Sequence, residues 1–169
     1  MDIREQIEKA GVPVNLRADA LNNKVAEEFG SKLDKATAAM FADFPVAFLV
    51  GNDSPQKDGF AAALLKAYMV QKNKTGRWMP TPRTAFLHDD FNLAGVTVIL
   101  SLDLYAPTAA KMLSALLRES INKGRAFIIC CSGIEIAEEL LGKEFMAFIS
   151  HLSVFVDVGI PRAKILEVK

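Results

Sequence analysis

The sequence is poor in the residues that carry most disulfide and metal chemistry. Its 169 residues include two cysteines, two histidines and one tryptophan. The cysteines are adjacent, Cys130 and Cys131, inside an apolar stretch that predicts a strand. Neighbouring side chains on a strand point to opposite faces and rarely form a disulfide. We therefore expect no disulfide framework and a reducing, cytoplasmic location.

The chain also lacks net charge and long apolar runs. Basic and acidic residues number 20 each, so any contact with nucleic acid must come from a local patch. No apolar run reaches about 18 residues, and the amino-terminal MDIREQIEKAG lacks the apolar core of a signal peptide. Hydrophobic residues make up 51% and charged residues 24%, which predicts a folded globular chain with no membrane contact.

The most informative stretch is PVAFLVGNDSPQKDGFAAALLKAY, at 45–68. It predicts a buried strand at 46–50, a polar loop at 51–57 and an amphipathic helix at about 58–70. Strand, glycine-bearing loop, lysine and helix N-terminus is the order of a phosphate-binding P-loop. The pattern G-x-x-x-x-G-K-S/T, placed on Gly51, aligns Lys57 with the motif lysine and includes Asn52 in the loop.

Two positions depart from this motif. Gln56 replaces the second glycine, whose missing side chain lets the backbone curl round the phosphates. Asp58 replaces the magnesium-binding serine or threonine and places a negative charge at the helix N-terminus, where a phosphate would bind. Lys57 then has Asp58 and Asp53 as internal partners in place of a ligand. The pattern indicates a nucleotide-binding scaffold with a damaged phosphate site, or else a strand-loop-helix corner of an unrelated α/β protein.

Strands and helices alternate along the rest of the chain. Further strands are predicted at 84–88, 96–102, 126–131 and 153–158, with an added edge strand at 163–168. Helices are predicted at 1–10, at 16–40 with a break near Gly30, from 107 onward, at 134–141 and at 143–152. This order favours a three-layer α/β/α fold with a mainly parallel, five-stranded sheet. A helical amino-terminal segment, 1–44, and a P-loop NTPase-like region, 45–169, are expected to pack as one domain.

Ligands in such sheets bind at the carboxyl ends of the strands. Asp103 and Ser132 follow two of the predicted strands, as the Gly51 loop follows the first. We therefore expect all three to meet at one edge of the sheet.

A basic segment, KNKTGRWMPTPR, follows the first long helix and predicts a loop. It contains Lys72, Lys74, Arg77, Trp78 and Arg83. Basic residues around an exposed aromatic can hold single-stranded nucleic acid by phosphate contact and base stacking. The alternative is a solvated linker with Trp78 packed against the domain.

The order of these motifs resembles the ATPase domain of DnaC-, DnaI- and IstB-like AAA+ proteins, which are helicase loaders and transposition helpers. Gly11-Val12-Pro13 with Leu16-Arg17 resembles the segment preceding their core, and 46–57 resembles Walker A. The stretch 98–104 resembles Walker B, with Asp103 as its remaining acid and Leu102 in place of the other. Cys131-Ser132 stands at the sensor position, and Ser150-His151-Leu152 at the Ser-Arg-Leu arginine finger.

The resemblance implies an AAA+-like fold whose catalytic parts have been lost. Phosphoryl transfer needs the loop cradle, a metal, a positioned water and an arginine finger, and this chain lacks residues for several of these. We expect a non-catalytic adaptor or regulator in DNA replication or a mobile element, which binds a helicase, loader or initiator and forms homo- or hetero-oligomers. The vestigial nucleotide site comprises Gly51, Asn52, Gln56, Lys57, Asp58, Asp103 and Ser132.

Two alternatives remain open from the sequence. Lys57 and Asp103 survive, so the chain could still bind ATP or ADP with magnesium weakly and act as a loader with an atypical P-loop. An unrelated α/β enzyme could instead use Cys130 or Cys131 as a nucleophile, because Cys131 precedes a predicted helix N-terminus.

Overall fold

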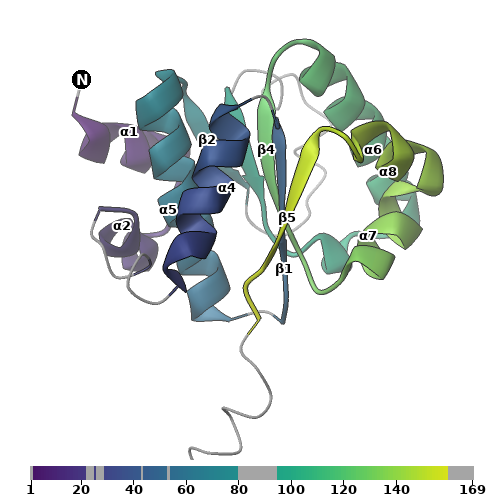
Figure 1. Cartoon of the computed structure of the whole chain (residues 1–169), viewed down its shortest axis with the longest axis horizontal. Helices are drawn as coiled ribbons and strands as arrows, with labels where there is room; N and C mark the ends of the chain where they lie inside the picture. The colour runs from purple at the N-terminus through teal and green to yellow at the C-terminus, as the bar shows by residue number, and fades with distance from the viewer. Residues whose placement is uncertain are drawn as a thin grey trace, which may run out of the picture.

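The computed structural model of the chain describes residues 2–21, 25, 29–42, 44–52, 54–79 and 95–159 (Figure 1). In this part of the chain, five strands form one parallel sheet. They are β1 (Val46–Val50), β2 (Gly76–Met79), β3 (Val96–Ile99), β4 (Ala126–Cys131) and β5 (Ser153–Asp157). Their spatial order is β2-β3-β4-β1-β5.

Helices cover both faces of the sheet and make the molecule three-layered (Figure 1). One face carries α1 (Ile3–Ala10), α2 (Val14–Leu21), α4 (Ser31–Phe41) and α5 (Pro55–Lys72). The other face carries α6 (Pro107–Asn122), α7 (Ile134–Leu141) and α8 (Lys143–Ile149). Each face of the sheet has its own hydrophobic core, and alternate strand residues point into one or the other. Ala47 and Leu49 lie in the core under α1, α2, α4 and α5, and Phe48 lies in the core under α6, α7 and α8. The predicted fold class is confirmed.

The strand order positions the candidate site. β4 lies between the loop-bearing β1 and β3, so the carboxyl ends of these three strands are neighbours. The pairing register brings Val50 of β1 beside Cys131 of β4. Read from the other edge, β5-β1-β4-β3-β2 is the order of P-loop NTPases that insert a strand between the P-loop and Walker B strands. The sheet is therefore P-loop NTPase-like.

The amino-terminal helices belong to the same core as the sheet. The side chain of Asp2 caps α1 by accepting from the Arg4 N–H, and Gly11, with φ +88°, ends the helix. The predicted break near Gly30 is also present, because α4 begins at Ser31. Ile7, Leu16 and Met40 are buried in one cluster with α5 and the sheet.

Two sequence predictions were wrong. The segment KNKTGRWMPTPR, predicted as a loop, contains strand β2. The third strand ends at Ile99 rather than at 102, because Ser101 adopts a left-handed conformation with φ +50° and Leu102–Leu104 forms a 3₁₀ turn. The strands predicted at 84–88 and 163–168 lie outside the described residues.

Candidate functional site

The loop after β1 is held tightly against the chain that leaves β5. The Gly51 N–H donates to the carbonyl oxygen of Cys131 at 3.1 Å. Gly51 has φ +150°, and a Cβ placed on it would lie 2.7 Å from the backbone nitrogen of Gly159. A side chain cannot fit that distance, so the crossing of two chain segments requires glycine here. The motif glycine thus has a packing role that needs no nucleotide.

Helix α5 begins three residues earlier than the sequence pattern predicted. Its N-cap is Ser54, whose side-chain oxygen accepts a hydrogen bond from the Lys57 N–H at 3.1 Å, and Pro55 is its first residue. Serine at the N-cap followed by proline at the first helical position is a strong start signal. The prediction missed it by fitting the loop to the longer P-loop pattern. Gln56, Lys57 and Asp58 therefore lie in the first helical turn and not in a loop.

This helix start removes most of the groups that hold a phosphate in a P-loop. A helix N-terminus binds anions through backbone N–H groups that have no partner inside the helix. Pro55 has no N–H, and the N–H of Lys57 is used by the Ser54 cap. Of the first three residues of α5, Gln56 alone keeps an N–H that no capping bond uses. The carboxylate of Asp58 in the same turn complements the helix dipole and repels an anion.

Lys57 is the most unusual side chain of the site, because it is 1% exposed. Its ammonium Nζ donates to the carbonyl oxygen of Gly51 at 2.8 Å. A buried lysine must be hydrogen-bonded for the fold to tolerate it, and this one is bonded to the loop that precedes its own helix. The sequence suggested Asp58 and Asp53 as its partners and did not predict the bond to this carbonyl; Asp53 lies outside the described residues.

Asp103 and Ser132 meet at the ends of β3 and β4, as the sequence predicted. The carboxylate Oδ1 of Asp103 accepts a hydrogen bond from the Ser132 N–H at 3.0 Å. Both residues are exposed to solvent. Asp103 thus has a structural role, which is to tie the turn after β3 to the end of β4.

The pKa of Cys131 is affected by the charges of two of these residues, Asp103 and Lys57. The pKa of its thiol is raised to about 11, mainly by burial and also by the negative charge of Asp103, while Lys57 and the Gly133 N–H lower the pKa in part. The structure therefore brings the Gly51 loop, Lys57, Asp103 and Ser132 together around one buried thiol. The sequence did not identify Cys131 as the centre of this group, because that depends on β4 lying beside β1.

The same pKa argues against the nucleophilic-cysteine alternative. With a pKa of about 11, about one thiol in 10⁴ is ionised at pH 7, and the thiolate is the reactive form. Cys130 and Cys131 are both free and buried. The environment is that of core cysteines, not of a catalytic thiol.

The predicted nucleic-acid segment does not have the required aromatic surface. Trp78 is a residue of β2 and lies beside Val98 of β3 in the sheet. Its side chain is 5% exposed and packs in the core. Its proposed stacking role was therefore wrong, and the alternative of a tucked tryptophan holds, although in a strand. Lys74 is exposed, Arg77 is half-buried, and the Lys72 ammonium lies 4.6 Å from the centre of the Phe41 ring. Arg83 lies outside the described residues.

In the residues that the structure describes, no three His, Cys, Asp or Glu side chains gather in a way that could hold a metal ion. His88, Asp89 and Asp90 lie outside these ranges. Within them, too, every helix is too short or too polar to cross a bilayer.

Comparison with known proteins adds no family to this picture. No model of a protein family matches the chain, and no curated protein matches it either.

Proposed function

We propose that the chain is a non-catalytic, AAA+-like adaptor or regulator that acts in the cytoplasm by binding a helicase, a loader or an initiator in DNA replication or a mobile element. The proposal joins the P-loop NTPase-like sheet to a strand-end site that lacks the groups for phosphoryl transfer. The partner class comes from the resemblance to helicase loaders and transposition helpers.

The observation that carries the proposal is the environment of Lys57. In a working P-loop this lysine reaches toward the β- and γ-phosphates. Here its ammonium is buried and donates to the Gly51 carbonyl, while the helix start before it is closed by Ser54 and Pro55. A phosphate would have to displace these contacts and approach the carboxylate of Asp58. The polar groups of the site serve the fold, which favours a scaffold without ATP hydrolysis.

The segment at the arginine-finger position supports the same conclusion. Ser150-His151-Leu152 follows the end of α8, and His151 is exposed. A finger stabilises transition-state charge with a permanently charged guanidinium. The imidazole of histidine lacks the permanent charge and the five-donor fork of a guanidinium. A neighbouring ATPase in a mixed oligomer would receive no comparable charge from this residue.

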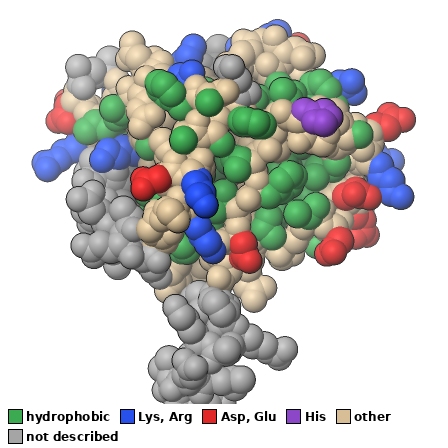
Figure 2. Space-filling model, viewed as in Figure 1, with side chains coloured by type: hydrophobic (Ala, Val, Ile, Leu, Met, Phe, Trp, Pro, Cys, Tyr) green, Lys and Arg blue, Asp and Glu red, His purple; other side chains and the backbone are tan. Residues whose placement is uncertain are grey.

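An adaptor also needs surface for a protein partner, and the sheet edge provides some. Phe155 of the edge strand β5 is 40% exposed and stacks on Phe48, with ring centres 5.1 Å apart. Figure 2 shows hydrophobic side chains that reach the surface between β5 and helices α7 and α8. Contiguous apolar surface of this kind is typical of contact sites.

Thermal melting with ATP and magnesium tests the catalytic half of the proposal. A nucleotide present at 100 times its dissociation constant stabilises the native state by about 2.7 kcal/mol, so binding must raise the melting point. We expect no rise for the wild type, and none for Lys57→Ala measured against its own baseline. A rise that Lys57→Ala abolishes would establish the alternative, a weak ATP- or ADP-binding loader.

Reconstitution with purified replication proteins tests the partner half. We expect the chain to co-elute with a replicative helicase, its loader or an initiator from the same source, and to change helicase loading on DNA. The heat-denatured chain provides the negative control. Failure to bind all three classes, together with unchanged loading, would refute the adaptor role.

A further inference from the structure

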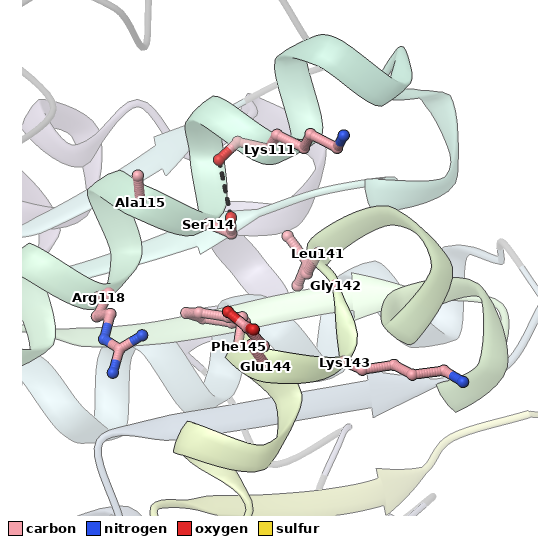
Figure 3. Close-up of a pocket in the computed structure, with 9 residues that line it drawn as sticks. All are labelled: Lys111, Ser114, Ala115, Arg118, Leu141, Gly142, Lys143, Glu144 and Phe145. Atoms are coloured by element: carbon pink, nitrogen blue, oxygen red, sulfur yellow. Dashed lines mark hydrogen bonds between the residues drawn. The ribbon is translucent and has the colours of Figure 1, made fainter.

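A second concave region lies on the other face of the sheet, away from the β1–α5 loop. It is an open groove of about 440 Å³ between α6 and the corner where α7 meets α8. Figure 3 shows that its residues come from α6 on one side and from 141–145 on the other. None of the residues assigned to the nucleotide site contributes to it. We call it the α6–α8 groove.

The floor of the α6–α8 groove is apolar. Leu141 is 3% exposed and Phe145 is 5% exposed, and Ala115 of α6 also lines the groove. An apolar side chain from another molecule could lie against these residues. Because Phe145 is only 5% exposed, too little of its ring face is accessible for a nucleic-acid base to stack on it.

The rim of the groove is basic, although the whole chain has no net charge. Lys111 and Arg118 lie on α6, and Lys143 opens α8 opposite them, with Glu144 as the single acidic residue. All four are exposed. In the described part of the chain, Lys111 and Lys143 have no ion-pair partner. The guanidinium of Arg118 lies 4.4 Å from the centre of the Phe148 ring, which holds it at one end of the groove.

We propose that the α6–α8 groove binds an acidic peptide segment of a partner protein, with one apolar side chain seated on Leu141 and Phe145 and flanking carboxylates at Lys111, Arg118 and Lys143. The three basic side chains on the rim are complementary in charge to an acidic segment, which favours this class of partner. An apolar floor between basic edges is typical of sites that take an amphipathic segment by its anchors. Nucleic acid fits less well, since Glu144 repels phosphates and no aromatic face is available.

This inference rests on the proposed function in that an adaptor needs such a segment to recognise, but its test uses no nucleotide and no replication protein. The probe is a phage-displayed library of random peptides, selected against the immobilised full chain at low salt. We expect selected peptides to combine Asp or Glu with Leu, Ile, Met or Phe. Synthetic copies should protect 111–118 and 141–145 from hydrogen exchange and bind at least tenfold more weakly when their acids become Gln.

Charge reversal on the rim provides the matched variants. Arg118→Glu and Lys111→Glu should each reduce peptide affinity at least tenfold, whereas Lys66→Glu on α5, on the other face of the sheet, should leave it unchanged. Circular dichroism and melting of the variants exclude unfolding as the cause. Affinity should also fall as salt is raised, because the rim is exposed and screened.

Several outcomes would overturn the inference. These are selection of no peptides, selection of neutral or basic ones, protection elsewhere on the chain, or equal binding by the rim variants. Tighter binding of a single-stranded oligonucleotide at the same residues would replace the peptide with nucleic acid, and rim-dependent dimerisation would replace it with a second copy of the chain. If the groove binds acidic peptides but no replication protein binds the chain, the inference survives and the proposed function fails.

Discussion

The strand-end site around Cys131 and the α6–α8 groove use their polar groups in opposite ways. In the strand-end site, the ammonium of Lys57 and the carboxylate of Asp103 are hydrogen-bonded to backbone groups of neighbouring segments. In the groove, the charges of Lys111 and Lys143 face solvent. A charge that is hydrogen-bonded to the backbone contributes to the fold, whereas an exposed charge without an ion-pair partner is open to a ligand. The charges on which the proposed peptide binding depends thus lie on the other face of the sheet from Lys57.

The largest effect should follow substitution of Gly51. We expect Gly51→Ala to lower the free energy of unfolding by about 4 kcal/mol, because the new Cβ meets the Gly159 backbone and the conformation disfavours a side chain. Gly124→Ala is the matched control, since Gly124 has φ +82° with nothing within 4 Å, and should lose about 1 kcal/mol. Chemical denaturation measures both. Equal losses would show that the close crossing does not constrain the loop.

Truncation of Lys57 should distinguish a structural lysine from a ligand-binding one. We expect Lys57→Ala to cost about 3 kcal/mol, from lost packing and an unsatisfied Gly51 carbonyl. Lys143→Ala on the groove rim should change stability by less than about 0.5 kcal/mol. Urea denaturation of both variants checks the contrast. If Lys57→Ala is as stable as the wild type, Lys57 has no structural role and the contrast drawn between the strand-end site and the groove is wrong.

Alkaline pH should weaken the strand-end site through Cys131. The pKa of its thiol is raised from 9.0 to about 11 in the folded state, so its contribution to stability is complete below pH 9 and is lost as pH rises to 11. The expected loss is about 2 kcal/mol. Comparison with Cys131→Ala isolates it, because Tyr105, whose pKa burial raises to about 12, remains in both proteins. Identical pH profiles would place Cys131 in a less buried environment than the structure gives it.

The smallest effect concerns the contact between Arg118 and Phe148. We expect Arg118→Ala to cost about 0.5–1 kcal/mol, the usual value of an exposed cation–π pair. Lys111→Ala, which loses no such contact, should be close to neutral in the same denaturation assay. A loss of more than about 2 kcal/mol in the free energy of unfolding would mean that Arg118 stabilises the fold, as Lys57 does, rather than being free for a ligand.

The sequence predicted the fold class because its central strands are strong apolar runs. VAFLV, AFIICC and SVFVD each match an observed strand with little error. The weak strand β2 was missed, since GRWM begins with glycine, includes an arginine and follows a polar loop. No local pattern encodes the order of the strands, which depends on the packing of helices on both faces.

Four of the seven residues predicted for the nucleotide site lie close together at the strand ends. Gly51, Lys57, Asp103 and Ser132 do converge, because the carboxyl ends of parallel strands lie at one edge. The burial of Lys57 could not be foreseen, since lysine is rarely buried and only the tertiary structure encloses it. The early start of α5 was foreseeable from Ser54-Pro55, and the resemblance to a longer loop obscured it.

The position of β1 in the sheet also has a consequence for folding during synthesis. Its two neighbours are β4 and β5, which a ribosome delivers long after β1 and α5 have emerged. Pairing of such distant segments is entropically slow, and unpaired apolar strands are prone to aggregate. The VAFLV strand therefore emerges well before either strand that flanks it, and this topology leaves an aggregation-prone segment without its pairing partners until β4 has been made.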